Sequence, residues 1–174
     1  MARVALSRKE PVKSWNSTDL MATAGKIKAE YDATPYDARP SEILVDIIGL
    51  GAGVYDRCRE LGPPVRGVNV GEAAASRENC ARLRDELWFK GREWFQDRAC
   101  SMPQDDALVA ELTARTYSFT STGKMVVESK ADMKKRGMRS PDLADAFLLT
   151  FAGGERRKER YRKPEPRRHS AWAA

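Results

Sequence analysis

The run Ile43–Ile48 most constrains what this chain can fold into. It is apolar and rich in β-branched residues except for Asp46, which is typical of a strand buried on both faces. A helix is expected over 54–61, ended by Gly62 and two prolines, and a second strand over 65–70. Strand, helix and strand in this order predict a right-handed parallel crossover in an α/β domain.

Local patterns elsewhere predict further helices and a hairpin. Ser17–Asp19 resembles the capped start of an amphipathic helix that ends near Tyr31. Apolar periodicity predicts helices over 79–96 and 107–114, and two short runs around Thr120–Gly123 predict a hairpin. The last predicted helix opens with Ser140 as its N-cap and Pro141 as its first residue.

The net charge of +6 is unevenly distributed over the 174 residues. Residues 154–174 contain eight Lys or Arg and three Glu, which leaves 23 basic and 22 acidic residues in 1–153. The nearly neutral part has enough apolar residues for one core, so we expect one domain over 1–153. Residues 154–174 lack apolar periodicity and are expected to be a disordered basic tail, either solvated or in contact with nucleic-acid phosphates.

The residue types present exclude several kinds of chemistry. The three cysteines are widely spaced, and the only histidine, His169, lies in the basic tail. We therefore expect reduced thiols, no zinc site and no Ser-His-Asp or Cys-His catalysis. No apolar stretch is long enough to span a membrane and no secretion signal is visible, so a cytoplasmic location is the default expectation.

Carboxylates are the remaining candidates for catalysis. Asp46 lies among Leu, Val and Ile, where an ionised group is costly unless it is paired or binds a metal. It is either hydrogen-bonded to local amides or a metal ligand. Asp142 and Asp145 are spaced to share one helix face. The helix dipole accounts well for Asp142 and less well for Asp145, which lies about a turn further in.

The glycine-rich segment 49–53 lies between the first predicted strand and the helix after it. Its pattern is GxGxG, not the GxGxxG of dinucleotide-binding folds, and no acidic strand end follows at the spacing of a ribose contact. We expect a close approach to another backbone segment or to a nucleic-acid phosphate.

Five motifs occur in order between about residue 15 and residue 152. They are Val45–Arg57, Val68–Gly71, Arg84–Trp88 followed by Arg92–Trp94, Glu128–Lys130 with Lys135–Gly137, and Ser140–Ala146. Together they resemble the C-terminal nuclease domain of phage terminase large subunits, whose helix carries an Arg-x-Glu-x-Trp motif. The ordered set is much more specific than any one of its members.

The resemblance implies an α/β, ribonuclease H-like fold, with a central mixed sheet and flanking helices. It implies a site for two Mg²⁺ or Mn²⁺ ions, with Asp46 and Asp145 as catalytic ligands and Asp142 as an auxiliary ligand. The implied function is cleavage of concatemeric double-stranded DNA during genome packaging. The phage portal and the terminase small subunit are the implied partners, in the cytoplasm of a bacterial host that carries a phage or prophage.

The chain departs from the family pattern in two ways. The family's first metal-binding Asp lies on an opening strand without a counterpart here, and the GxxxxGK[ST] motif of the ATPase domain is absent. We therefore expect a partial nuclease domain without its first strand, which binds metal weakly and cleaves poorly in isolation.

Two alternatives remain. The first is a catalytically inactive remnant that binds DNA or the portal. The second is another ribonuclease H-like nuclease, such as a Holliday-junction resolvase, which leaves the Arg-x-Glu-x-Trp helix unexplained.

Overall fold

The computed structural model describes residues 2–4, 13–15, 19–97, 100–102 and 104–153. The α-helices of this part are α1 (Leu20–Ala33), α2 (Gly51–Leu61), α3 (Leu83–Gln96), α4 (Asp106–Ala114), α5 (Lys130–Lys135) and α6 (Asp142–Leu149). Its strands are β1 (Ala2–Val4), β2 (Lys13–Trp15), β3 (Ile43–Asp46), β4 (Val65–Val68), β5 (Tyr117–Phe119) and β6 (Met125–Val127). Two 3₁₀ helices are η1 (Tyr36–Ala38) and η2 (Thr150–Ala152).

The predicted strand–helix–strand unit is present. β3 pairs in parallel with β4, in a register that places Ile43 opposite Val65 and Asp46 opposite Val68, and α2 makes the connection. The connecting helix ends at Gly62, whose φ of 98° is a left-handed conformation that glycine adopts without steric cost. The crossover therefore places Asp46 at the carboxyl end of its strand.

The strands do not form one central sheet in the part of the chain that the structure describes. They form three separate two-stranded sheets, in which β1 pairs with β2, β3 with β4, and β5 with β6. A mixed α/β fold is confirmed, but a ribonuclease H-like central sheet is not. The prediction of a strand buried on both faces is wrong, because among the described residues β3 pairs only with β4, and its own residues are half-buried, or exposed at Asp46.

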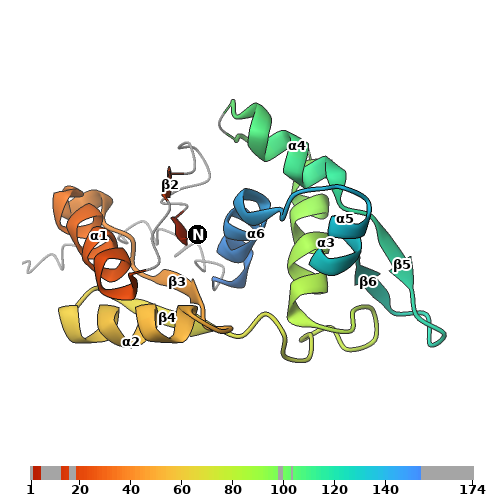
Figure 1. The fold of residues 1–174 in the computed structure, drawn as a ribbon, viewed down its shortest axis with the longest axis horizontal. Coiled ribbons are helices and arrows are strands. Elements are labelled where there is room, and N and C mark those ends of the chain that lie inside the picture. The colour runs from red at the N-terminus through yellow and green to blue at the C-terminus, as the bar shows by residue number, and fades with distance from the viewer. Residues whose placement is uncertain (1, 5–12, 16–18, 98–99, 103, 154–174) are drawn as a thin grey trace, which may run out of the picture.

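α6 lies between two groups of elements (Figure 1). On one side α1, α2, β3 and β4 enclose a core of Ala24, Ile27, Val54 and Cys58. On the other side α3 and α4 pack against Phe147 and Leu148 of α6. A third cluster, Val68, Val70 and Leu87, joins β4 to α3. The third cluster, against which Leu149 of α6 also packs, thus connects the two groups.

α3 begins at Leu83 rather than near Asn79, and its first acidic residues are buried. Asp85 accepts hydrogen bonds from the Arg82 N–H and from the Val127 N–H of β6, each with a nitrogen-to-oxygen distance of 3.0 Å. Glu86 accepts the Ala75 N–H over 2.7 Å. These two carboxylates satisfy backbone donors that would otherwise be buried without partners. The acidic residue of the Arg-x-Glu-x-Trp motif therefore holds the loop before α3 in place.

The cysteines and the apolar segments were both the subject of predictions from the sequence. Cys58, Cys80 and Cys100 are free thiols, as predicted. Among the described residues, no helix is long and apolar enough to cross a membrane. The predicted basic tail, 154–174, lies outside the described residues, and the division at residue 153 stays a prediction.

Candidate metal centre

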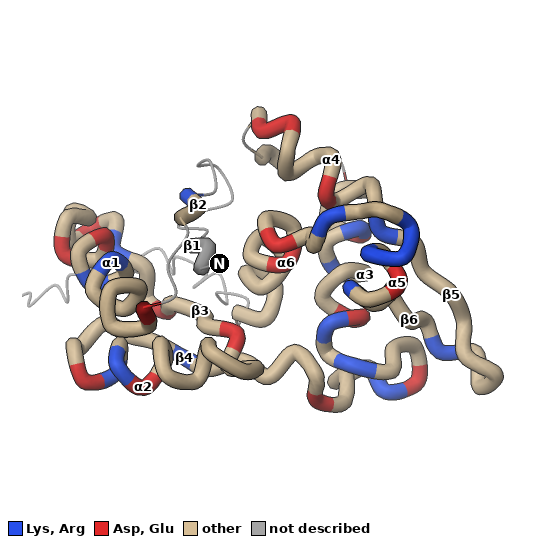
Figure 2. The backbone as a smooth tube through the Cα atoms, in the orientation of Figure 1, with Lys and Arg blue, Asp and Glu red and all other residues tan. Residues whose placement is uncertain are grey.

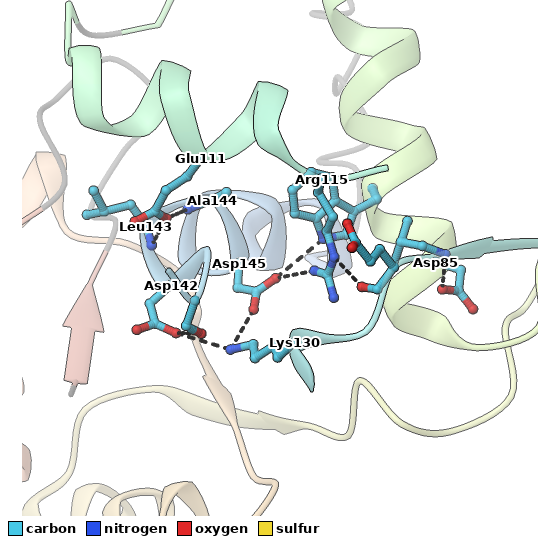
Figure 3. A network of polar contacts seen from close by, with 12 residues as sticks. Asp85, Glu111, Arg115, Lys130, Asp142, Leu143, Ala144 and Asp145 are labelled. Carbon is cyan, nitrogen blue, oxygen red and sulfur yellow. Dashed lines mark hydrogen bonds and ion pairs between the residues drawn. The ribbon is translucent and has the colours of Figure 1, made fainter. Parts of the chain in front are cut away.

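The carboxylates at the start of α6 share one cation. Lys130 Nζ lies 3.1 Å from Asp142 Oδ1 and 2.8 Å from Asp145 Oδ2 (Figure 3). Partial burial opposes the charge of Lys130, but the carboxylates of Asp145 and Asp142 raise its pKa above the ordinary value. Asp142 and Asp145 therefore lie on one face of α6, as their spacing predicted.

The other oxygen of Asp145 accepts two further hydrogen bonds. Arg115 Nη1, just after α4, donates to Asp145 Oδ1 over 3.1 Å, and Trp88 Nε1 of α3 donates to the same atom over 3.3 Å. The Arg115 guanidinium also lies over the Trp88 ring, 4.9 Å from its centroid. Asp145 is thus held by side chains from three separate segments.

Arg115 itself is deeply buried, with 0% of its side chain exposed. Its Nε donates to the Glu128 carbonyl over 2.7 Å, so the guanidinium joins the end of β6 to α6. Burial lowers the pKa of Arg115, while the carboxylate of Asp145 acts in the opposite direction. A buried guanidinium is unfavourable unless its partners are well placed, so this contact fixes the geometry around Asp145.

Asp46 is hydrogen-bonded to a local amide, which is one of its two interpretations. Its Oδ1 accepts the Ile48 N–H over 3.1 Å, as expected of an Asp at a strand end. Desolvation nonetheless raises the pKa of Asp46, and the nearby charge of Asp145 adds to this, although Arg84 and Lys130 oppose it. The charge of Asp145 is thus one of several influences on Asp46, and the role of Asp46 as a metal ligand stays a prediction.

The start of α6 is positioned by a residue far away in the sequence. Glu111 of α4 accepts the N–H groups of Leu143 and Ala144 over 2.6 and 3.0 Å (Figure 3). The prediction that Ser140 caps this helix is wrong, because Pro141 occupies the N-cap position and Ser140 Oγ donates to Asp142 Oδ1 over 2.6 Å. A carboxylate from a neighbouring helix thus satisfies the free N–H groups.

Of the three carboxylates predicted from the sequence, two are linked by a shared ion-pair partner. Asp142 and Asp145 share Lys130, whereas Asp46 is linked to the pair only in that the charge of Asp145 helps to raise the pKa of Asp46. Across the described residues there is no group of three or more His, Cys, Asp or Glu side chains arranged to hold a metal ion. The assignment of these three residues as metal ligands stays a prediction.

Sequence reasoning missed Arg115 altogether and Lys130 as a partner of the carboxylates. Arg115 is an isolated arginine after a short helix, without any pattern that marks it. Lys130 lies inside the Glu128–Lys130 motif, so the motif was a usable signal although its role was not evident.

Lys and Arg residues are frequent along one segment near the candidate centre. Figure 2 shows Lys and Arg concentrated on α5 and the turn that follows it, close to the acidic start of α6. The positions are Lys130, Lys134, Lys135, Arg136 and Arg139. Arg136 forms a two-pronged contact with Glu128, at 2.7 and 2.5 Å. Lys135 is likewise paired with Asp132, and Lys130 with the carboxylates of the candidate centre.

Comparison with known proteins defines the fold class. No model of a protein family matches the sequence, and neither does any curated protein. Among solved structures, a mutant nuclease domain of the large terminase subunit gp2 of bacterial virus Sf6, with manganese and β-thujaplicinol, matches with a TM-score of 0.66 and 17% identity. The match covers 82% of this chain and 75% of that one.

Two further solved structures agree with this match. The nuclease domain of the same Sf6 subunit matches at a TM-score of 0.60 and 18% identity, over 82% of this chain and 75% of that one. The large terminase nuclease of thermophilic phage G20c, with bound cobalt, matches at 0.60 and 15% identity, over 81% of this chain and 65% of that one. The chain therefore has the fold of phage terminase nuclease domains, as the ordered motifs predicted.

Proposed function

We propose that this chain is the nuclease domain of a phage terminase large subunit and that it cleaves DNA with the help of a divalent metal ion. The observation that carries the proposal is the ammonium group of Lys130 between the carboxylates of Asp142 and Asp145. This pair attracts a cation, and it lies in the fold of nuclease domains that have been solved with manganese and cobalt.

The donor atoms suit a hard divalent ion. Asp46 and Asp145 would be the protein ligands and Asp142 an auxiliary ligand, all through carboxylate oxygens of the kind that Mg²⁺ and Mn²⁺ prefer. Because the described residues supply fewer than three grouped ligands, water and substrate oxygens would complete the coordination, as is usual for Mg²⁺. When bound, the ion would supply electrophilic activation for phosphodiester hydrolysis.

The residues of the chain have separate tasks in this proposal. Asp46 and Asp145 concentrate negative charge where the cation binds. The basic side chains of α5 and its turn attract the phosphate backbone of DNA, whose binding is dominated by such contacts. Lys130 balances the carboxylates in the absence of the ion.

The wider role is proposed from the resemblance of the ordered motifs. We propose that the substrate is double-stranded concatemeric DNA, cut during genome packaging in the cytoplasm of a bacterial host by a phage or prophage protein. The portal and the terminase small subunit would be the partners. The fold, shared with the Sf6 and G20c nuclease domains, supports the nuclease part of this proposal.

Plasmid nicking tests the proposal. The purified chain is incubated with supercoiled plasmid and Mn²⁺, Mg²⁺ or EDTA, and Mn²⁺ binding is measured in parallel by calorimetry. We expect slow nicking that requires metal and is lost in Asp46→Asn and Asp145→Asn. Asp56→Asn, on the exposed surface of α2, is the matched control and retains both activities. Nicking that persists in Asp145→Asn would contradict the proposal, and DNA binding without metal binding would support an inactive binding module.

A further inference from the structure

We propose that Arg115 and Trp88 are positioning residues that fix Oδ1 of Asp145 and so leave Oδ2 as the oxygen available to a metal ion. This inference rests on the proposed function, because it assigns a task to residues around the proposed ligand. It concerns neither substrate nor catalysis directly, since both residues act through Asp145.

The two oxygens of Asp145 have very different surroundings. Oδ1 accepts the Arg115 Nη1–H over 3.1 Å and the Trp88 Nε1–H over 3.3 Å. Arg115 is fully buried and Trp88 is partly buried. Within the described residues, Oδ2 receives Lys130 alone, over 2.8 Å, from a side chain that is 45% exposed. A cation that approaches from solvent therefore displaces a flexible donor from Oδ2 more easily than two enclosed donors from Oδ1.

Arg115 is suited to this task by its shape. Its Nε donates to the Glu128 carbonyl while Nη1 donates to Asp145, and its Cζ lies 4.9 Å from the centroid of the Trp88 ring. A guanidinium can make these contacts at once because its donors are fixed in one plane, whereas a lysine ammonium has no such plane. The ring and the carbonyl thus determine where Nη1 points.

The burial of Arg115 argues against a role in stability alone. Its Nη2 is buried and has no hydrogen-bond partner within the described part of the chain. Buried ion pairs are often replaced by apolar residues without loss of stability, and an unsatisfied buried donor adds a further cost. The Arg115 guanidinium is charged, buried and incompletely hydrogen-bonded. Its place beside Asp145 is explained if it orients that carboxylate.

Metal binding rather than cleavage gives the clearest test. Trp88→Phe keeps an aromatic ring but removes one N–H, and Arg115→Lys keeps the charge but removes the fork. Groups that orient metal ligands typically contribute about 10-fold or more to metal affinity. We expect each variant to raise the Mn²⁺ dissociation constant, measured by calorimetry on the full chain, by about 10-fold. Trp94→Phe, within the aromatic cluster with Phe147 and Phe151, is the control and leaves the constant unchanged.

A local signal completes the design. In the ¹⁵N–¹H spectrum of the wild type, the Trp88 indole peak is identified by its absence in Trp88→Phe. Substoichiometric Mn²⁺ is expected to broaden this peak before those of Trp15 and Trp94, because the ion binds the carboxylate that the indole contacts. Thermal unfolding of each variant shows whether it is folded, and if Arg115→Lys is not, Trp88→Phe alone decides.

The outcomes separate this inference from the proposed function. An unchanged Mn²⁺ constant in folded Trp88→Phe, together with weakened binding in Asp145→Asn, overturns the positioning role but leaves the metal site intact. Failure of the wild type to bind Mn²⁺, or equal binding by Asp145→Asn, overturns the proposed metal site and this inference with it. Weakened binding in both Trp88→Phe and Asp145→Asn supports both.

Discussion

Lys130 Nζ lies 2.8 Å from Asp145 Oδ2, the oxygen that we assign to a metal ion. An ion bound there would therefore compete with the lysine for the same carboxylate. The two ion pairs of Lys130, with Asp145 and with Asp142, are partly exposed, so each is expected to contribute about 0.5 kcal/mol. Removing both ion pairs is expected to change the affinity for a competing cation by no more than roughly fivefold.

We accordingly expect Lys130→Met to bind Mn²⁺ more tightly than the wild type, by roughly three- to fivefold. Calorimetry on the metal-free protein measures this directly. Lys134→Met, on the same helix, removes an equal charge at an exposed position and separates direct competition from a general change in potential. Equal gains in both variants would show that Lys130 does not occupy the proposed site.

Glu128 directly follows β6 and lies two residues before Lys130. Its carbonyl accepts the Arg115 Nε–H. Its carboxylate accepts two bonds from Arg136, which with contacts from Thr116 lower its pKa from 4.5 to about 2. A carboxyl group with a depressed pKa contributes stability that is complete above its unfolded pKa. This contribution is lost as the pH falls from about 4.5 through about 2.

Glu128→Gln is therefore expected to lower the free energy of unfolding at pH about 6, with a smaller difference from wild type at pH about 3. Urea unfolding at both pH values measures the difference. Glu60→Gln removes a carboxylate from an exposed pair with Arg57, and it is expected to have little effect at either pH. A loss of stability in Glu128→Gln that is independent of pH would contradict the assignment.

Gly51 allows α2 to start directly against the strand end that carries Asp46. A Cβ built on Gly51 would lie 1.7 Å from the Asp46 carbonyl oxygen, which is backbone and cannot rotate away. Gly51→Ala is therefore expected to destabilise the protein by about 3 kcal/mol through overpacking, and to weaken Mn²⁺ binding by displacing Asp46.

Gly25→Ala is the matched control for this substitution. Gly25 lies within α1, and a Cβ there would meet nothing within 4 Å. It is expected to stabilise the protein by about 0.5–1 kcal/mol, because alanine loses less backbone entropy in a helix. Thermal unfolding compares the two, and a stable Gly51→Ala variant with normal metal binding would show that the close approach is not required.

Local features of the fold were predictable because their determinants lie within a few residues of one another. Asp19 caps α1 by accepting the Met21 and Ala22 N–H groups, as its position before an amphipathic run predicted. The β5–β6 hairpin and the parallel pairing of β3 with β4 were predicted for the same reason, from turn residues and apolar runs. Long-range contacts had no such signal.

The surroundings of Asp145 illustrate what the sequence does not determine by pattern. Arg115 and Trp88 lie 30 and 57 residues away from it along the chain, and Glu111 replaces the predicted cap of α6 from 33 residues before Ala144. Such contacts depend on how α3, α4 and α6 pack, which side-chain periodicity does not specify. The candidate ligands were proposed from residue type and resemblance and stay a prediction, whereas the contacts of Arg115 and Trp88 with Asp145 had no signal in the sequence.

Residues 154–174, with eight basic and three acidic residues, give a last prediction. Phosphate contacts by such a segment need charge but no fixed structure, and each contact that is lost reduces the slope of log affinity against log salt by about 0.9. Deleting 154–174 is therefore expected to weaken binding to a short DNA duplex and to flatten its salt dependence, measured by fluorescence anisotropy. A variant with the same residues in scrambled order is expected to bind like the wild type, because composition decides the contact. If the deletion leaves both affinity and slope unchanged, the folded part, including the basic side chains of α5, makes the phosphate contacts alone.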